Sequence, residues 1–422
     1  MTPATRALVT LDDVRRVRPL VARDTLRTPL IAANALSARL GIDIRLKLEN
    51  LQITGSFKAR GAAVKLAGLS AEAARTGVIA MSAGNHAQGV AYHAGRRGIP
   101  ATIVMPRATP FSKVERTRQF GATVLLEGDT VAEARAVAER LRRERNLTFV
   151  HPYDDPDIVA GQGTIGLEML EDAPDLDVIV VPIGGGGLIA GIAAAATALK
   201  PEIEIVGAET RLYASMADAL AGRPPDGGTG VTVAEGIAVR EPGALPLEMA
   251  RRLVRHIVLL DEPPIERAVQ LLVEEQKIVA EGAGAAGLAA LLVEPERFRG
   301  RRVGIVIGGG NIDSRLLASI LMRGLLRDGR MVRLRVEITD MPGTLSTVAG
   351  LIAAAGGNIV EVYHHRMFHD VSVKLTELDV EVETRNVDHV REIVERLTGA
   401  GFPARRLGMA SHTGDPPPGD PT

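Results

Sequence analysis

Residues 178–191, with the sequence VIVVPIGGGGLIAG, combine an apolar run, four consecutive glycines and a second apolar segment. This order predicts a strand, a tight loop and a helix. Successive free backbone N–H groups and the positive end of a helix together form an anion site, most often for phosphate. Four glycines in a row cost conformational entropy without a packing gain, which favours such a site over a flexible turn. Residues 185–190 also fit a loose dinucleotide fingerprint, so a nicotinamide enzyme remains an alternative.

The sequence around this stretch, from about residue 40 to 325, alternates short β-rich runs with longer helical patterns. Such alternation predicts an α/β fold with a mostly parallel sheet and helices on both faces. The expected strands are residues 44–48, 78–81, 101–105, 123–126, 178–182, 203–208, 257–260 and 303–307. A surface helix is expected over residues 130–145, with its apolar stripe at Val131, Ala134, Val137, Ala138 and Leu141.

The pattern changes at residues 328–330, a charged connector containing glycine, and we place a domain boundary there. The following unit has the order βαββαβ of ferredoxin-like domains. Its elements are expected at residues 332–338, 344–355, 358–365, 372–381, 387–398 and 404–407. Residues 411–422 contain three consecutive prolines and almost nothing apolar, so we expect a disordered tail.

Length, charge and composition exclude several classes of function. A chain of 422 residues corresponds to two or three domains. With 50 Lys and Arg against 51 Asp and Glu, the chain has no overall field that attracts nucleic acid or a membrane. The absence of cysteine excludes disulfides, thiolate zinc sites and cysteine nucleophiles. Residues 1–10 lack the pattern of a secretory signal, and the apolar runs are shorter than the about 20 residues of a membrane span. We therefore expect a cytoplasmic protein.

Three further segments carry chemically useful side chains. In SFKARG, residues 56–61, Lys58 falls at the expected N-terminus of a helix, which disfavours a cation and would help a neutral amine attack an aldehyde. A solvated surface lysine is the other interpretation. SAGNH, residues 82–86, suits a carboxylate ligand and equally suits a simple helix cap. GGGN, residues 308–311, lies at the carboxyl end of a strand, where open α/β sheets bind ligands.

Together these segments resemble the pyridoxal-phosphate enzymes of the tryptophan-synthase-β type (fold type II), and among them the threonine/serine dehydratases. The resemblance rests on residues 47–62 (KLENLQITGSFKARGA), 82–89 (SAGNHAQG), 160–164 (AGQGT) and the tetraglycine loop, and it covers residues 25 to 325. Residues 340–345 (DMPGTL) resemble an ACT domain, as in the medium-length threonine ammonia-lyases.

The resemblance implies two lobes of parallel sheet with helices on both faces and a C-terminal ferredoxin-like ACT domain. The implied limits are residues 1–327 for the catalytic domain, with a small lobe inserted at about 51–147, and 328–410 for the ACT domain. The implied reaction converts threonine to 2-oxobutanoate and ammonia, with serine to pyruvate as a side activity. Isoleucine biosynthesis and threonine catabolism are both compatible with it.

The resemblance also implies a role for each site residue. Lys58 would hold the cofactor through its amine and later remove the substrate α-proton, and Lys58 and Ser82 are the expected catalytic residues. Phe57 would lie against the pyridine ring and Asn85 would bond the ring hydroxyl. Gly308 stands where the family commonly places a serine, threonine or cysteine beside the pyridine nitrogen. The phosphate would be bound by Gly184, Gly185, Gly186, Gly187 and Leu188, and the substrate carboxylate by Ser82, Ala83, Asn85 and His86.

The ACT-like unit implies regulation by an amino acid, with isoleucine or valine as the first effectors to try. Its expected effector residues are Asp340, Pro342, Gly343 and Leu345, with Asn358 and Ile359 from a neighbouring subunit of a homodimer or homotetramer. A unit that only dimerises is the alternative.

No metal site is expected. Glu209 matches an acidic ligand of related racemases, but Ser215 stands at the later acidic position. His364 and His365 point to opposite faces of a strand, and His369 completes no cluster with them. The competing functions are a serine racemase or β-replacing enzyme, a nicotinamide oxidoreductase and a non-catalytic amino-acid sensor.

Overall fold

The computed structural model describes residues 8–224, 228–365 and 375–407. The chain divides into two units, Met1–Ser314 and Arg315–Thr422. The predicted tail and His369 lie outside the described residues. The predicted limits of the catalytic domain, its small lobe and the ACT domain stay predictions.

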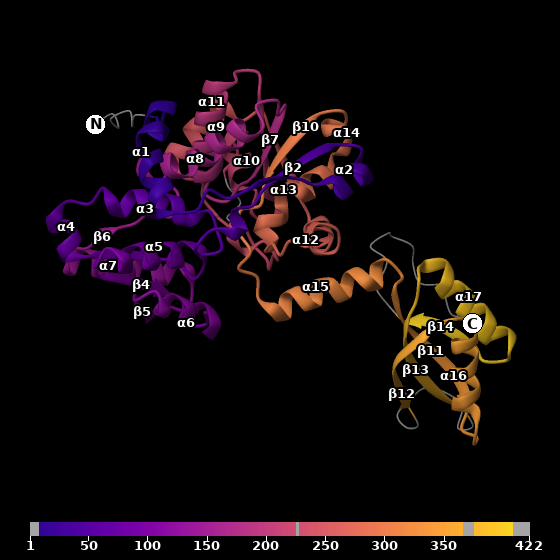
Figure 1. Ribbon diagram of the computed structural model, residues 1–422. Helices are drawn as coiled ribbons and strands as arrows, with labels where there is room; N and C mark the ends of the chain where they lie inside the picture. The colour runs from indigo at the N-terminus through magenta and orange to yellow at the C-terminus, as the bar shows by residue number, and fades with distance from the viewer. Residues whose placement is uncertain (1–7, 225–227, 366–374, 408–422) are drawn as a thin grey trace. The chain divides into compact units, whose positions relative to one another are not determined.

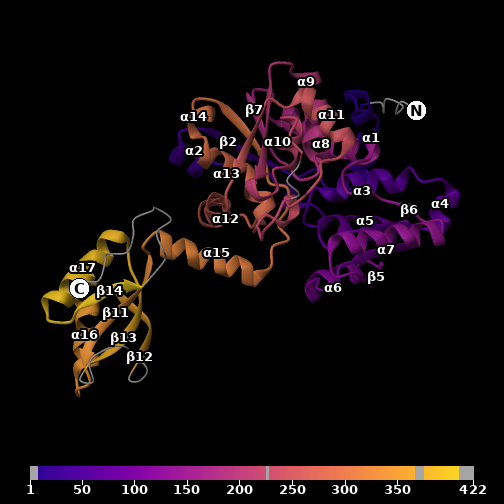
Figure 2. The ribbon, with the colours of Figure 1, turned by 180° about the vertical axis from the view of Figure 1, so that it is seen from behind.

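Two separate sheets form the frame of the first unit (Figures 1 and 2). The strands of the six-stranded sheet are, in spatial order, β1 (Leu30–Ala32), β2 (Asp43–Lys47), β10 (Arg302–Val306), β7 (Val178–Pro182), β8 (Glu204–Thr210) and β9 (His256–Leu260). Those of the four-stranded sheet are β5 (Thr123–Leu126), β4 (Ala101–Met105), β3 (Val78–Met81) and β6 (Thr148–Phe149). All neighbours are parallel except β1 and β2. The expectation of parallel sheets in two lobes is confirmed. The lobe with the six-stranded sheet is called here the large lobe, and the lobe with the four-stranded sheet is called the small lobe.

Helices cover both faces of the sheets. The helices of this unit are α1 (Leu11–Asp24), α2 (Asn34–Leu40), α3 (Lys58–Ala67), α4 (Ala71–Thr76), α5 (Asn85–Arg96), α6 (Phe111–Gln119), α7 (Val131–Glu144), α8 (Pro156–Asp172), α9 (Gly187–Leu199), α10 (Ser215–Leu220), α11 (Ala244–Leu253), α12 (Glu262–Gln276), α13 (Gly282–Val293) and α14 (Pro295–Phe298). Short 3-10 turns are η1 (Glu49–Leu51), η2 (Arg211–Tyr213) and η3 (Glu235–Ile237). Among the described residues no helix is long and apolar enough to cross a membrane.

Strand β3 demonstrates why both faces of the small-lobe sheet need a cover. Its Val78 and Ala80 side chains pack in one core with apolar residues of α5, whereas the intervening Ile79 packs with residues of α7. All three side chains are fully buried. Because successive side chains of a strand point to opposite faces, a strand buried on both sides carries a continuous apolar run.

The predicted surface helix is confirmed as α7, and its cap explains where it begins. Thr130 accepts a hydrogen bond from the Glu133 backbone N–H, which satisfies one of the free donors of the first turn. Ala138 and Leu141 of the predicted stripe are buried. Val131 was expected in the same stripe, but it is exposed because it lies in the first turn of the helix.

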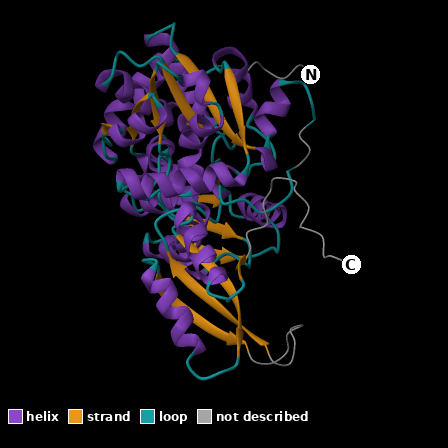
Figure 3. Ribbon diagram, turned by 90° about the vertical axis from the view of Figure 1, so that its right-hand side faces the viewer, coloured by secondary structure: helices purple, strands orange, loops and turns teal. Residues whose placement is uncertain are grey.

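The second unit combines the long helix α15 (Ser314–Arg327) with the predicted βαββαβ arrangement. Its sheet is antiparallel throughout, in the order β12 (Asn358–His365), β13 (Leu375–Glu383), β11 (Met331–Thr339) and β14 (Ala404–Leu407). Helices α16 (Thr344–Ala354) and α17 (Val387–Gly399) pack on one face of this sheet (Figure 3). Val332, Leu334 and Val336 alternate along β11 into this core. The predicted ferredoxin-like unit is confirmed.

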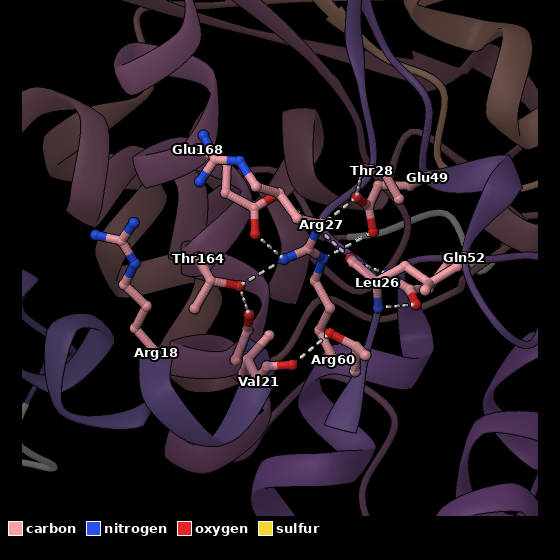
Figure 4. Close-up of polar contacts among 12 residues, drawn as sticks. Arg18, Val21, Leu26, Arg27, Thr28, Glu49, Gln52, Arg60, Thr164 and Glu168 are labelled. Atoms are coloured by element: carbon pink, nitrogen blue, oxygen red, sulfur yellow. Dashed lines mark hydrogen bonds and ion pairs between the residues drawn. The ribbon is translucent and has the colours of Figure 1, made fainter. Parts of the chain in front are cut away.

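A cluster of four charged side chains lies inside the first unit, and it is called here the Arg60 cluster. Its members are Lys47, Glu49, Arg60 and Glu168. Figure 4 shows Arg60 between Glu49 and Glu168. Arg60 is completely buried and donates two hydrogen bonds of 2.8 Å to Glu49. It donates two more, of 2.7 and 2.8 Å, to Glu168. Lys47 Nζ donates to Glu168 Oε2 at 2.6 Å. Two cations are therefore balanced by two carboxylates.

The Arg60 cluster joins four segments of the chain near the start of α3. Arg60 belongs to α3, Glu168 to α8, Glu49 to η1 and Lys47 to the end of β2. Burial by itself would raise the pKa of the Glu168 carboxyl, but the hydrogen bonds and charges of Arg60 and Lys47 hold that pKa below its ordinary value. The Glu168 carboxylate therefore stays ionised at neutral pH opposite Arg60 and Lys47.

We predict that Glu168→Gln destabilises the protein by about 3–5 kcal/mol, because it leaves two buried cations facing one carboxylate. The matched control is Glu171→Gln in the same helix, since Glu171 pairs with Arg18 and Arg27 at the exposed surface. That change is expected to cost less than about 1 kcal/mol. Urea denaturation of both variants measures the free energies of unfolding, and equal losses would contradict the prediction.

Candidate active site

Lys58 is the first residue of α3, as the sequence predicts, and its side chain is partly buried. Its Nζ donates a hydrogen bond of 2.9 Å to the backbone carbonyl of Pro152 and lies 5.1 Å from the centre of the Phe57 ring. Burial lowers the pKa of the Lys58 amine from its ordinary value of 10.5 to about 8. At neutral pH a usable fraction of this amine is therefore neutral and nucleophilic.

The turn that contains Pro152, whose carbonyl accepts a hydrogen bond from Lys58, also contacts the tetraglycine loop. His151 fixes this turn, because its Nδ1 accepts from the backbone N–H groups of Tyr153 at 3.3 Å and Asp154 at 2.8 Å. Burial lowers the pKa of His151 to about 4, so its ring stays neutral and able to accept. The Tyr153 ring lies so close to Gly185 that a Cβ there would come within 2.2 Å of it. Only glycine fits at this position.

The four glycines lead directly into α9, whose N-terminus is free of side-chain caps. Gly186 is the N-cap and has a left-handed backbone with φ of 91°. The first N–H groups of a helix have no partner within it, and here no side chain caps them. The start of α9 therefore offers backbone donors and the positive end of a helix dipole to an anion such as phosphate.

The residues predicted to bind the substrate carboxylate follow β3. Ser82 Oγ accepts a hydrogen bond of 3.2 Å from the Gly84 N–H, and Asn85 is the first residue of α5. His86 is buried, with its Nε2 2.9 Å from the carbonyl oxygen of Val150. Burial lowers the pKa of His86 to about 3, so the ring is neutral. A carboxylate at this turn would meet the backbone and the polar side chains of Ser82 and Asn85 instead of a charged histidine.

The structure brings the loop after β10 beside Phe57. The Phe57 N–H donates to the carbonyl of Gly308 at 3.0 Å. A Cβ built on Gly308 would lie 3.4 Å from the nearest ring atom of Phe57, which is ordinary contact. This position therefore has room for a side chain that the sequence does not supply.

Glu281, which the sequence analysis missed, faces this loop. The residue precedes α13, and its Oε1 accepts a hydrogen bond of 2.7 Å from Asn85 Nδ2. Burial raises the pKa of the Glu281 carboxyl to about 7. Tyr153 and Glu281 carry no local sequence signal, because Gly185 and Asn85, which they contact, lie far away along the chain. His151 was missed because it bonds only backbone groups of its own turn.

Unsatisfied polar atoms at the site favour a polar ligand. The hydroxyls of Thr54 and Ser56, immediately before Lys58, are buried and have no hydrogen-bond partner. Buried polar groups without partners are uncommon and point to a missing ligand or water. Together with the amine of Lys58 and the donors of the tetraglycine loop, they fit a phosphorylated aldehyde such as pyridoxal phosphate.

The predicted effector residues do not meet within one chain. Asp340 follows β11, and Gly343 caps α16 with φ of 91°. Asn358 begins β12 and pairs with Glu383 of β13, which in turn pairs with Met331 at the start of β11. Asn358 therefore lies at the opposite end of the sheet from Asp340. Pro342 and Leu345 accompany Asp340, and Ile359 accompanies Asn358. A pocket formed by both groups needs a second copy of the unit.

Glu209 caps a helix in this structure. Its carboxylate oxygens accept from the backbone N–H groups of Met216 at 2.8 Å and Ala217 at 3.0 Å. In the described ranges, no three His, Asp or Glu side chains are grouped so that they could hold a metal ion.

Comparison with known proteins gives two family matches. The model of the pyridoxal-phosphate-dependent enzymes matches residues 21–309. The model of the ACT domain matches residues 332–399.

Two curated relatives match over most of the chain. The chain is 44% identical to an L-threonine ammonia-lyase of Thermotoga maritima, over 95% of this chain and 100% of the relative. It is 45% identical to an L-threonine ammonia-lyase of Geobacter sulfurreducens, over 89% of this chain and 94% of the relative.

Solved structures match the first unit. The processed form of threonine deaminase isoform 2 from Solanum lycopersicum has a TM-score of 0.71 and 34% identity, covering 75% of this chain and 87% of that one. Maize serine racemase has a TM-score of 0.70 and 33% identity, covering 76% of this chain and 99% of that one.

We predict that the Lys58 amine titrates near pH 8 in protein freed of bound cofactor. Burial disfavours the charged form, so the neutral fraction rises at lower pH than for an exposed lysine. Carbon-13 reductive methylation followed by NMR measures the midpoint, and the Lys58→Ala variant identifies the resonance by its loss. A midpoint in the range of the exposed lysines would contradict the prediction.

A second prediction compares two glycines of the site. Gly185→Ala is expected to lower stability by about 1–3 kcal/mol, because its Cβ would overlap the Tyr153 ring. Gly308→Ala is expected to change the free energy of unfolding by less than about 0.5 kcal/mol, because its Cβ would be in ordinary van der Waals contact with the Phe57 ring. Urea denaturation of the two variants tests this, and the reverse order of stabilities would refute it.

Proposed function

The chain belongs to the family of pyridoxal-phosphate-dependent enzymes and carries a C-terminal ACT domain, and on this premise we propose that it is a threonine ammonia-lyase. It converts L-threonine to 2-oxobutanoate and ammonia, and L-serine to pyruvate as a side activity. The relatives that match over 89% or more of this chain carry that name. The observation that carries the proposal is the Lys58 amine at the start of α3, with its pKa lowered to about 8.

Bound pyridoxal phosphate supplies an aldehyde that takes up an amine and a conjugated ring that accepts electrons when the α-proton leaves. Lys58 would hold this aldehyde through its amine and would be the base for the substrate α-proton. Its hydrogen bond to the Pro152 carbonyl holds the amine beside the turn whose next residue, Tyr153, contacts the tetraglycine loop. The backbone N–H groups of Gly184, Gly185, Gly186, Gly187 and Leu188 would bind the phosphate.

The turn after β3 orients the amino acid. Ser82, Ala83, Asn85 and His86 hold the substrate carboxylate, with the backbone N–H groups of the α5 N-terminus as donors. Ser82 and Asn85 add side-chain donors. Phe57 would lie against the cofactor ring, and Asn85 would also bond its hydroxyl.

A serine racemase is the second candidate, because maize serine racemase has the same fold at 33% identity. Gly308 favours the lyase. It has space for a Cβ but offers no side chain to the ring nitrogen of the cofactor. A ring held without that contact would accept electrons less readily, which would favour elimination over racemisation.

The ACT domain makes the enzyme responsive to an amino acid, with isoleucine or valine as the effector. The turn with Asp340, Pro342, Gly343 and Leu345 binds the effector carboxylate at the start of α16, and Asn358 and Ile359 come from the neighbouring subunit. The enzyme is therefore a homodimer or homotetramer. It acts in the cytoplasm, in isoleucine biosynthesis or threonine catabolism.

We predict that the purified protein absorbs near the band of lysine-bound pyridoxal phosphate and forms 2-oxobutanoate from threonine. Lys58→Ala is expected to lose both properties, because no other amine occupies its position. Lys65→Arg in the same helix is the control, since it preserves the ion pairs with Asp155 and Asp157. A colourless protein that pyridoxal phosphate cannot reconstitute would refute the proposal, and formation of D-serine from L-serine without 2-oxo acid would favour the racemase.

A further inference from the structure

A continuous chain of hydrogen bonds runs from the surface of the small lobe to Glu281. Arg116 Nη1 donates to Asn311 Oδ1, Asn311 Nδ2 donates to Asn85 Oδ1, and Asn85 Nδ2 donates to Glu281 Oε1. Each of the three distances is 2.7 Å. The four side chains come from α6, the loop after β10, the start of α5 and the residue before α13. The chain of bonds therefore crosses between the small and the large lobe at every step.

The two ends determine how the two amides point. A guanidinium can only donate and an ionised carboxylate can only accept, whereas an asparagine amide does both. Arg116 therefore requires the oxygen of Asn311 to face it, which leaves the Asn311 nitrogen to face Asn85. Glu281, when ionised, accepts from the Asn85 nitrogen, and because its pKa is about 7, protonation would place a donor at this end of the hydrogen-bond chain. All donors point in one direction, and bonds aligned in this way strengthen one another.

Asn311 is held tightly in the middle of this chain. Its Nδ2 also donates to the Thr54 carbonyl at 2.8 Å. Gly55 has a left-handed φ of 71°, and a Cβ there would lie 2.5 Å from Asn311 Oδ1. Thr54 and Gly55, which lie just before Lys58 in the sequence, are therefore in close contact with the Asn311 side chain.

A second contact between the lobes lies beside the first. Lys113, three residues before Arg116 on α6, pairs with Glu235 of η3. Lys113 and Glu235 are both close enough to Glu281 to influence its carboxyl electrostatically. The contact between α6 and the large lobe therefore also influences the electrostatic environment of the Glu281 carboxyl.

We propose that Glu281 and Arg116 are positioning residues for the reaction. Acting from opposite ends of this series of hydrogen bonds, they fix the amide of Asn85 in the orientation that the site uses. They do so only when the small and the large lobe are in contact. The inference rests on the proposed function, because it assigns Asn85 to the cofactor and substrate. The amide keeps one N–H and one oxygen lone pair free for them. Neither Arg116 nor Glu281 needs to touch the reacting atoms.

The test is a double-mutant cycle on the holoenzyme, with Arg116→Met, Glu281→Gln and the double variant. Glu281→Gln introduces an N–H donor at this end of the hydrogen-bond series and so allows the Asn85 amide to flip. Arg116→Met keeps an aliphatic side chain but removes the donor at the other end. The readouts are kcat/KM for threonine and, separately, the affinity of cofactor-free protein for pyridoxal phosphate by absorbance titration. Arg118→Met on the same helix is the matched control, because Arg118 is exposed and no described side chain pairs with it.

We expect each single variant to lose about tenfold in kcat/KM and the double variant to lose about tenfold as well, because either change frees the same amide. The affinity for pyridoxal phosphate is expected to fall in parallel. Arg116→Lys, which restores a donor-only group, is expected to recover part of both losses, and Arg118→Met to change neither.

Additive losses, about a hundredfold in the double variant, would overturn the inference, because two independent contacts would then account for them. Unchanged kcat/KM and cofactor affinity in both single variants would overturn it too. A wild-type protein that binds pyridoxal phosphate but forms no 2-oxobutanoate would refute the proposed function instead, and the affinity cycle would still decide the role of Arg116 and Glu281.

Discussion

The completely buried guanidinium of Arg60 imposes the condition on which the arrangement of the first unit depends. A charge without access to water costs several kcal/mol unless opposite charges and hydrogen bonds surround it. Glu49 and Glu168 meet this condition from two sides, and Lys47 balances the second carboxylate. The cluster therefore ties together the end of β2, the start of α3 and the C-terminal half of α8. Lys58 lies two residues before Arg60 in the same turn, so the requirement that places Arg60 also places the amine.

The site itself lies where the carboxyl ends of parallel strands from both lobes meet. Residues 82–86 follow β3 of the small lobe, whereas the tetraglycine loop follows β7 and Gly308 follows β10 of the large lobe. Open α/β sheets bind ligands at this edge because helix N-termini and free backbone donors gather there. Side-chain hydrogen bonds such as the one from Arg116 to Asn311 join the two edges directly.

The strands and the glycine loops could be predicted from the sequence because each leaves a local pattern. Buried parallel strands are continuous apolar runs, and the eight predicted strands of the first unit all occur, with ends within two residues of those expected. β1 and β6 were missed because three and two residues are too few to form a pattern. Glu281 was missed for another reason. Its partner Asn85 is 196 residues away, and only the fold brings the two together.

The tetraglycine loop is a place where the structure corrects the reasoning from the sequence. The sequence favours a ligand there because four glycines in a row offer no packing gain. In the structure Gly185 is needed by the Tyr153 ring, and Gly186 is needed by a left-handed backbone and by the nearby Met216. Close packing by itself therefore requires glycine at two of the four positions, and binding of a phosphate by the loop stays a prediction. The contact with the Tyr153 ring, which leaves no space for a Cβ, also fixes the position of the loop backbone. Since Tyr153 directly follows Pro152, which binds Lys58, the loop and the amine are positioned by one turn of the chain.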